Sequence, residues 1–316
     1  MKTPVIIFFL LLFPFLSCKK DTSLSTDWNR VDVPVMRDAI DGENYEVASD
    51  AHVFHDTSGN LKMIYSGDVD GKIQIKLASG LDWTSWEKVN AVVYENLPSG
   101  EDTHKETPFY RLADNGKHQI FFIGYDDEVT YKSQVFMAES DNLEGPYTTI
   151  ETPVVPRGEI AGKDVYLITS PSIVEHDGVL HMAFLAWNAS PEEVTEVWVM
   201  GAKSVDDGYT WSDFEEVECP IGMEGQLTKG NDGKYYAVST QEYEDREGIY
   251  YAEAAHPFGP WEYVETPVLV RKGKPYEKSE IIAPQLILNP ANGKKHLYYT
   301  GADQAKGWWI MMAVEP

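Results

Sequence analysis

The chain has 316 residues, 43% of them hydrophobic and 12% aromatic, and its formal net charge is −25. This length and hydrophobic content allow one large domain with a sizeable core. A chain this acidic is repelled by nucleic acids and by anionic membrane surfaces, so we expect neither as a partner.

The first residues have the charge and hydropathy pattern of a targeting segment. A positive start at Lys2 precedes an apolar run, residues 5–16, that is too short for a membrane-spanning helix. The run ends in Phe15-Leu16-Ser17-Cys18, which resembles a lipobox. We therefore predict a signal peptide over 1–17, lipidation of Cys18 and a tether over 18–27. The protein would then be held in the bacterial cell envelope by its lipid alone. A plain secretory signal is the alternative.

Cys219 is the only other cysteine, so a lipidated Cys18 leaves no disulfide to form within the chain. It lies in an alternating stretch, Val217-Glu218-Cys219-Pro220-Ile221. Such a cysteine is more typical of a buried packing residue than of a nucleophile.

From residue 28 onward one segment type recurs five times. An aromatic residue is followed by two residues, a hydrophobic residue and an end rich in Val and Thr, so each copy is predicted to be a strand. The copies begin at Trp28, Trp86, Tyr147, Phe214 and Trp261.

Two further strand types precede or separate these copies. A hairpin with a Gly-containing turn recurs at 51–66, 107–123, 170–184, 225–239 and 283–300. A third strand recurs at 72–78, 134–138, 197–202, 248–252 and 308–313.

Four strands repeated five times predict an all-β, five-bladed β-propeller that spans residues 28–316 as one domain. The repeat begins with a fourth-strand copy at Trp28 and stops after a third-strand copy at 308–313. A closed ring explains this offset, because the N-terminal strand then completes the last blade and covers its edge.

In such a blade the start of the first strand and the end of the second lie on one face, at the mouth of the channel. The mouth residues that we expect there are carboxylates, amides, hydroxyls and aromatics. From first-strand starts come Asp50, Glu106 (one residue before the register), Ser170 and Glu224, with His52 and His104 close by. From second-strand ends come Asp68, Tyr125, Asp126, Trp187, Gln241, Glu242 and Asp303. This mixture is suited to a carbohydrate.

A single acidic residue at a strand start is most often a turn-capping group. Here acidic residues recur at equivalent positions, which gives a functional role for Asp50 and Glu224 equal weight with the capping role. Glycoside cleavage requires two carboxyl groups, one to protonate the leaving oxygen and one to activate water or attack the sugar.

With the repeats aligned, the mature chain resembles the five-bladed propeller glycoside hydrolases, above all glycoside hydrolase family 43 and its arabinanase and xylosidase relatives. Ser49-Asp50-Ala51-His52-Val53 is similar to the family's first-blade segment, whose Asp is the general base. Met223-Glu224-Gly225 is similar to its fourth-blade segment, whose Glu is the general acid. The resemblance implies an inverting hydrolase of plant or algal oligo- or polysaccharides. Asp50 would be the base and Glu224 the acid, about 6.5–9.5 Å apart.

The chain departs from the family at a third carboxylate, which tunes the acid and precedes a proline in the third blade. Ser170 stands at that position, before Pro171. We hypothesise that Glu106 replaces it. Altered or lost catalysis is the alternative.

Ser204-Val-Asp206-Asp-Gly208-Tyr-Thr210-Trp211 matches the Asp-box pattern of sialidase-like propellers. In those proteins the motif is a structural turn on the outside of a blade, and we predict the same here. Sialidases also need three arginines for a carboxylate, and near the expected mouth we find mainly Arg111 and Arg157, so we do not expect a sialidase.

Other functions stay open. A non-catalytic, cell-surface carbohydrate-binding propeller would not need the Asp50–Glu224 pair. A phosphorylase or lyase on this fold is a further alternative, although a phosphorylase needs a basic cluster that is not evident. A protein scaffold is the last. No ligand spacing supports a cofactor or a channel-bound calcium ion, and we expect a monomer.

Overall fold

The computed structural model describes residues 28–39, 45–126, 132–222, 224–243 and 246–316. Every regular element in these ranges is a β-strand, so the described chain has no helix long and apolar enough to cross a membrane. The predicted signal peptide 1–17, the predicted lipidation site Cys18 and the tether 18–27 lie outside the described residues.

The strands pair in consecutive antiparallel runs, and one parallel pairing joins the first and the last of these runs into a single eight-stranded sheet. The first run contains β2 (Glu46–His55), β3 (Leu61–Val69), β4 (Lys72–Gly80) and β5 (Trp86–Val93). The second contains β6 (His104–Leu112), β7 (His118–Tyr125), β8 (Gln134–Ser140) and β9 (Thr148–Thr149). The third contains β12 (Leu167–His176), β13 (Val179–Trp187), β14 (Val197–Ser204) and β15 (Ser212–Glu216).

The fourth run contains β16 (Leu227–Lys229), β17 (Tyr235–Tyr243), β18 (Arg246–Ala254) and β19 (Trp261–Tyr263), with β20 (Leu269–Val270) also paired to β18. The fifth contains β21 (Glu280–Leu288), β22 (Lys295–Asp303), β23 (Gly307–Val314) and β1 (Asn29–Arg30). A small hairpin of β10 (Gly158–Ile160) and β11 (Lys163–Val165) separates the second and third runs. The N-terminal strand thus pairs with the C-terminal one, as the offset of the repeats predicted.

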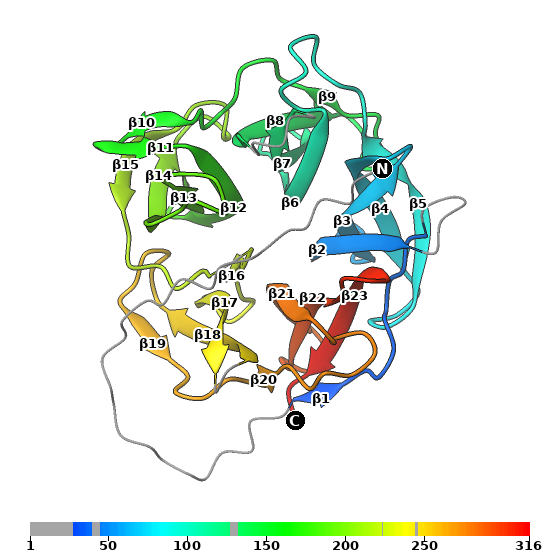
Figure 1. Cartoon of the computed structure of the whole chain (residues 1–316). Coiled ribbons are helices and arrows are strands. Elements are labelled where there is room, and N and C mark those ends of the chain that lie inside the picture. The colour runs from blue at the N-terminus through cyan, green and yellow to red at the C-terminus, as the bar shows by residue number, and fades with distance from the viewer. Residues whose placement is uncertain (1–27, 40–44, 127–131, 223, 244–245) are drawn as a thin grey trace.

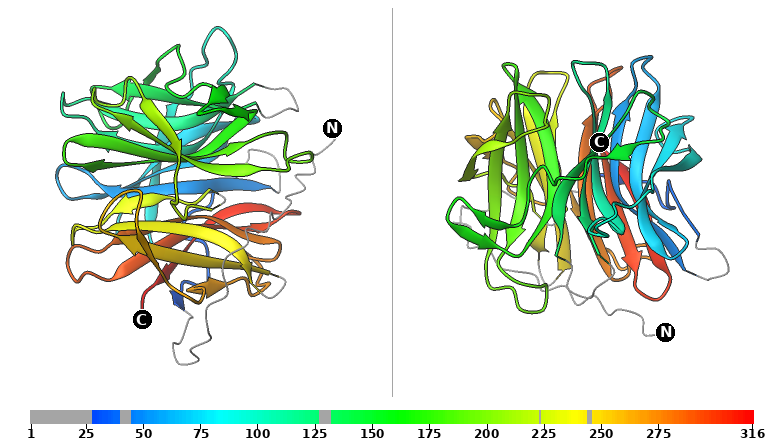
Figure 2. Two further views of the ribbon diagram at one scale, coloured as in Figure 1. Left: turned by 90° about the vertical axis from the view of Figure 1, so that its left-hand side faces the viewer. Right: turned by 90° about the horizontal axis from the view of Figure 1, so that it is seen from above.

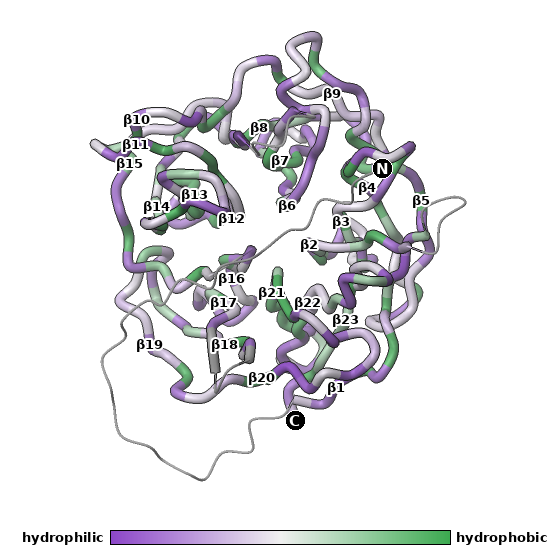
Figure 3. Tube along the Cα trace, viewed as in Figure 1, coloured by the Kyte–Doolittle hydropathy of each residue, from purple (hydrophilic) through white to green (hydrophobic). Residues whose placement is uncertain are grey.

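The runs are arranged around a common centre, with β2, β6, β12, β16 and β21 nearest the middle (Figure 1). Seen from the sides, the strands run between two opposite faces of the molecule (Figure 2). The tube is green, and therefore hydrophobic, along β21 beside the centre (Figure 3). Every residue of β21 is buried, which fits an innermost strand that is covered on both faces.

Each hydrophobic cluster of the core lies between two successive runs. Because side chains alternate along a strand, one strand serves two clusters. In β7, Phe121 belongs to the cluster shared with the third run, whereas Ile120 and Phe122 belong to the one shared with the first run. The fifth run packs in the same way on the first, since Tyr298 and Tyr65 share one cluster.

A buried ion pair fastens β1 to the fifth run. The Arg30 guanidinium donates to the Glu277 carboxylate and to the backbone oxygen of Val270. The hydroxyl of Tyr299 donates to the other carboxylate oxygen of Glu277 at 2.5 Å. The Arg30 and Glu277 side chains are only 5% and 2% exposed, so both charges depend on this contact for solvation.

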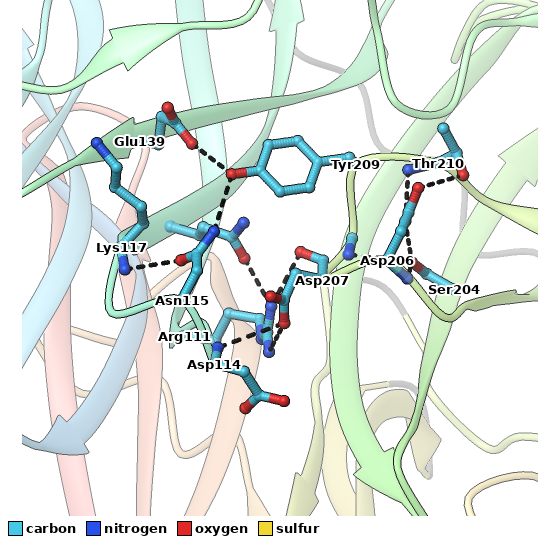
Figure 4. Close-up of polar contacts among 12 residues, drawn as sticks. Arg111, Asp114, Asn115, Lys117, Glu139, Ser204, Asp206, Asp207, Tyr209 and Thr210 are labelled. Carbon is cyan, nitrogen blue, oxygen red and sulfur yellow. Dashed lines mark hydrogen bonds and ion pairs between the residues drawn. The ribbon is translucent and has the colours of Figure 1, made fainter.

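The Asp-box turn links the third run to the second (Figure 4). Within the turn, the Asp206 carboxylate accepts from the backbone and hydroxyl of Thr210 at 2.9 and 2.6 Å. Two residues of the second run contact the turn. Arg111 donates to the backbone oxygen of Asp207 at 3.0 Å, and Glu139 accepts from the Tyr209 hydroxyl at 2.7 Å. The predicted structural role is therefore confirmed. His104 begins β6, whereas Arg111 lies near the other end of this strand. The expectation that Arg111 lies near the mouth was therefore wrong.

Candidate active site

One non-glycine residue per run has a positive φ at the same place in the repeat. These residues are Asp50 (54°), Thr107 (48°), Ser170 (58°), Glu224 (52°) and Ala283 (49°). In the first, second, third and fifth runs the strand pairing skips residues at this place, as a β-bulge does. The left-handed conformation costs a non-glycine residue about 1–2 kcal/mol. Bulges recur next to active sites, where they redirect a side chain.

The repeat alignment located these positions correctly, including the second run, where Thr107 holds the register and Glu106 precedes it. The structure brings three of the predicted carboxyl groups together. Asp50 and Glu224 share a hydrogen bond, and the charge of Asp50 acts on Glu106. These groups come from three different runs.

Asp50 is 5% exposed and is surrounded by hydrogen-bond donors. The Ser49 hydroxyl donates to its carboxylate at 2.9 Å, and Ser66 and the backbone N–H of Thr107 also contribute. Burial raises the pKa of Asp50, while each of these donors lowers it by favouring the charged form. Burial is the largest effect, so the pKa of Asp50 is raised on balance, and the donors around it limit this rise.

Glu224 has the opposite environment. Burial raises its pKa well above the ordinary value, and the charges of Asp50, Glu106 and Glu280 raise it further. The hydrogen bond between Glu224 and Asp50 raises the pKa of Glu224 and lowers that of Asp50. Burial and the neighbouring charges thus both favour the protonated form of Glu224.

The backbone after Glu224 is held close to β17. A Cβ atom on Gly225 would lie 2.0 Å from the backbone oxygen of Val238, so only glycine fits there. The N–H of Gly225 donates to the backbone oxygen of Gly222 at 2.9 Å. This tight loop sets where the Glu224 side chain begins.

The direct hydrogen bond corrects one expectation. An inverting pair was expected to stand about 6.5–9.5 Å apart, but the Asp50 and Glu224 carboxyl groups contact each other. The two carboxyl groups are therefore closer in this structure than the separation that an inverting pair uses to hold its water.

Glu106 lies beside the pair and is held by an aromatic partner. The Tyr125 hydroxyl donates to Oε1 of Glu106 at 2.5 Å, and the His104 ring stacks on Tyr125 with centroids 5.0 Å apart. Burial, and next the charge of Asp50, raise the pKa of Glu106 to about 7. The Tyr125 hydrogen bond acts against this rise. Tyr125 and His104 therefore belong to the same group of side chains as Glu106.

The His52 side chain contacts residues of two other runs. Its Nδ1 lies 2.8 Å from Oε1 of Gln226, and it also bonds the backbone of Tyr110. Its ring centroid is 4.2 Å from that of Phe109. Burial lowers the pKa of His52 to about 4, so the ring is neutral at pH 7. His52 is thus held by groups of two other runs in this structure, and a role in substrate binding stays a prediction.

The remaining predicted residues have local partners or are packed away. Ser170 and Trp187 are each 3% exposed, and Trp187 belongs to the apolar cluster between the third and fourth runs. Asp68 accepts from the N–H of Gly71 at 3.2 Å, and Gln241 donates to Ser239 at 2.9 Å. Asp303 accepts from the N–H of Ala305 at 3.1 Å.

Two predicted residues are located by their backbone pairing or by their place in the chain. Glu242 pairs with Glu247 in the β17–β18 ladder, and Asp126 directly follows β7. Glu280, which acts on Glu224, was missed because it precedes the register position Ala283 by three residues. An acidic residue at the very start of an innermost strand was the signal that could have found it.

The described residues contain no group of three or more His, Cys, Asp or Glu side chains arranged to hold a metal ion. The expected lack of a cofactor stays a prediction. Cys219 is 3% exposed, and burial raises the pKa of its thiol to about 12. This confirms that it is a packing residue.

No family model matches the sequence, and no curated protein does. Among solved structures, the chain is similar to a thermostable family-43 glycoside hydrolase, at 14% identity and a TM-score of 0.64, over 85% of this chain and 93% of that one. It is also similar to the α-L-arabinofuranosidase from Podospora anserina in complex with cellotriose, at 12% identity and a TM-score of 0.67, over 93% and 98%. A third similar structure is a β-xylosidase, at 16% identity and a TM-score of 0.59, over 85% and 92%. At these low identities the likeness concerns the fold, and the chain therefore shares its fold with glycoside hydrolases.

Proposed function

We propose that the protein is an inverting glycoside hydrolase of plant or algal oligo- or polysaccharides, built on a five-bladed β-propeller. Support for the propeller comes from the repeated four-strand runs, the clusters shared by successive runs, including the last with the first, and the pairing of β1 with β23. The observation that carries the function is the Asp50–Glu224 pair, in which two carboxyl groups from different runs share a hydrogen bond and the pKa of Glu224 is raised well above its ordinary value.

In the proposed reaction Glu224 donates its proton to the glycosidic oxygen as the bond from that oxygen to the anomeric carbon breaks. Asp50 takes a proton from water as the water oxygen bonds the anomeric carbon from the opposite face. Afterwards Asp50 is protonated and Glu224 ionised, and exchange with solvent restores the starting state. Productive binding requires Glu224 to exchange its hydrogen bond to Asp50 for one to the glycosidic oxygen.

Glu106 takes the part of the third carboxylate that is absent at Ser170. Its negative charge disfavours ionisation of Glu224, so the acid keeps its proton near neutral pH. Tyr125 fixes the position of that charge through its 2.5 Å hydrogen bond. The tuning group thus comes from the second run instead of the third.

The test is the pair of variants Asp50→Asn and Glu224→Gln, assayed on 4-nitrophenyl glycosides and on plant and algal oligosaccharides. Each variant is expected to lose at least about a thousandfold in kcat while it still binds substrate. Proton NMR of the first product formed should show the inverted anomer. Variants that turn over a cleaved substrate as fast as the wild type contradict the assignment.

A non-catalytic carbohydrate-binding protein is the second candidate. It is favoured by the hydrogen bond between Asp50 and Glu224, since this pair is closer than the separation of about 6.5–9.5 Å typical of inverting hydrolases. Binding of an oligosaccharide by the wild type with no cleavage of any substrate in the panel would support this alternative.

We also propose that the protein is a monomer anchored in the cell envelope by a lipid on Cys18. The support is the apolar run followed by Ser17-Cys18. Metabolic labelling with radioactive palmitate should mark the wild type and not the Cys18→Ala variant. Equal labelling of both would remove the lipidation site from Cys18.

A further inference from the structure

Gln226 links the segment that carries Glu224 to the segment that carries Asp50. It stands two residues after Glu224, and its partners directly follow Asp50. Its Nε2 donates to the backbone oxygen of Ala51 at 3.2 Å, and its Oε1 lies 2.8 Å from Nδ1 of His52. Both bonds are therefore made within two residues of a proposed catalytic carboxyl group.

The donor and acceptor roles in this link follow from the chemistry of the partners. A backbone oxygen only accepts, so the amide must turn its nitrogen to Ala51 and its oxygen to His52. The Nδ1 atom of His52 therefore carries a hydrogen and donates it to Gln226. The Gln226 and His52 side chains are each 6% exposed, which keeps competing water away from these bonds.

The backbone at both ends of the link is itself held by hydrogen bonds. The N–H of Val238 in β17 donates to the backbone oxygen of Gln226 at 3.1 Å. On the other side, the N–H of Asp50 donates to the Thr300 hydroxyl at 3.1 Å. The Gln226 amide thus joins two segments that other contacts already hold in place.

The same place in the repeat, two residues after the left-handed residue, fastens other runs to each other. Ser172 exchanges two hydrogen bonds with the backbone of Leu227, at 2.6 and 2.9 Å, and so joins the third run to the fourth. Gln285 exchanges two with the backbone of Val53, at 2.7 and 2.9 Å, and joins the fifth run to the first. Gln226 reaches further, since the fifth run lies between the fourth and the first around the centre (Figure 1).

The proposed reaction gives this link a task that the two carboxyl groups cannot perform. Productive binding breaks the hydrogen bond between Glu224 and Asp50, because Glu224 then donates to the glycosidic oxygen. Both bonds of Gln226 can remain while this happens, since neither involves a reacting group. A fixed distance between acid and base matters, because a displacement of about 1 Å can cost about a hundredfold in rate.

We propose that Gln226 is a positioning residue, whose amide bonds to Ala51 and His52 hold the acid-bearing and base-bearing segments at a fixed distance across the centre. This inference rests on the proposed function for the roles of Glu224 and Asp50. The link can be tested without any cleavage, because it determines how closely the two carboxyl groups approach each other.

The experiment compares the wild type with Gln226→Met and with the matched control Gln285→Met. Methionine has nearly the length of glutamine, and each variant loses two hydrogen bonds to β2. Carbon-13 NMR follows the titration of the Glu224 carboxyl carbon, which is assigned with Glu224→Gln. In Gln226→Met the two carboxyl groups should separate, so the pKa of Glu224 should fall by at least about one unit. In Gln285→Met it should stay within about 0.3 units of the wild type.

A second pair of variants tests the other end of the link, and decides the question if Gln226→Met does not fold. His52→Asn places an amide nitrogen where Nδ1 of histidine stands, so it should keep the bond to Gln226 and the titration of Glu224. His52→Phe keeps a ring but has no donor, and should lower the pKa of Glu224 in the same direction as Gln226→Met.

Hydrolysis of 4-nitrophenyl glycosides provides the second readout. Gln226→Met should lower kcat at least about thirtyfold with KM within about threefold, whereas Gln285→Met should keep kcat within about threefold. An unmoved Glu224 titration in both Gln226→Met and His52→Phe, or an equal shift in Gln285→Met, would overturn the positioning role. A wild type that cleaves nothing refutes the proposed hydrolase instead, and the NMR comparison still decides the role of Gln226.

Discussion

The carboxyl groups of Asp50 and Glu224 share a hydrogen bond, although the two residues lie on opposite halves of the chain. Asp50 is further solvated by Ser49, Ser66 and the backbone of Thr107, whereas the neighbours of Glu224 are mainly other carboxylates. The pKa of both carboxyl groups is raised by burial, and that of Glu224 is raised well above its ordinary value, which fits Glu224 as the proposed acid of the pair.

The first prediction concerns the pH profile of Glu106→Gln. In the wild type kcat/KM should fall on the alkaline side as Glu224 loses its proton, and on the acid side as Asp50 gains one. Removing the charge of Glu106 makes ionisation of Glu224 easier, so the alkaline limb should move to lower pH by about one unit. The measurement is kcat/KM from pH 4 to 9. Ser170→Ala serves as the control and should leave both limbs in place, and an unmoved alkaline limb in Glu106→Gln would exclude Glu106 as the tuning group.

The second prediction concerns stability. The folded-state pKa of Glu106, about 7, is above its ordinary value of 4.5, so between these values the folded state binds more protons than the unfolded state. The contribution of Glu106 to the free energy of unfolding is fully present below about pH 4.5 and is lost as the pH rises through 7. Glu106→Gln, which never ionises, should therefore be more stable than the wild type at pH 8 by about 1–3 kcal/mol, with little difference at pH 4. Urea unfolding at both pH values measures this. A larger gain at pH 4 than at pH 8 would show that the sign is wrong.

The third prediction tests the attachment of β1. Arg30→Ala leaves the Glu277 carboxylate buried without its cation, and should lower the free energy of unfolding by about 3–5 kcal/mol. The control is Lys274→Ala, which removes an ion pair of 2.8 Å between Lys274 and the exposed Asp32 and should cost under about 1 kcal/mol. Equilibrium urea unfolding compares the two variants. Similar values for both would mean that β1 contributes little to closing the ring.

The fourth prediction concerns the loop that carries the acid. In Gly225→Ala the new methyl group would stand 2.0 Å from the backbone oxygen of Val238, so the backbone beside Glu224 must move. Activity should drop at least about a hundredfold, since small displacements of a catalytic group are costly. Gly233→Ala, a turn position with no atom within 4 Å of the added carbon, is the matched control and should keep its activity while losing some stability. If both variants are equally active, the close approach at Gly225 does not position the acid.

The sequence by itself determined the all-β class, the repetition of the strand pattern and the equivalence of Asp50, Ser170 and Glu224. These features are local, because alternation along a strand and Gly-containing turns depend on neighbouring residues. The pairing of β1 with β23 also followed from the sequence, since the repeat begins and ends out of phase.

Tertiary structure alone decided which side chains meet. The hydrogen bond between Asp50 and Glu224 and the bonds of His52 to Gln226 and Tyr110 all depend on contacts between separate runs. Such contacts depend on how the sheets pack around the centre and on the left-handed residue that directs the side chain at each strand start. The spacing of residues along one strand specifies neither the packing nor this conformation.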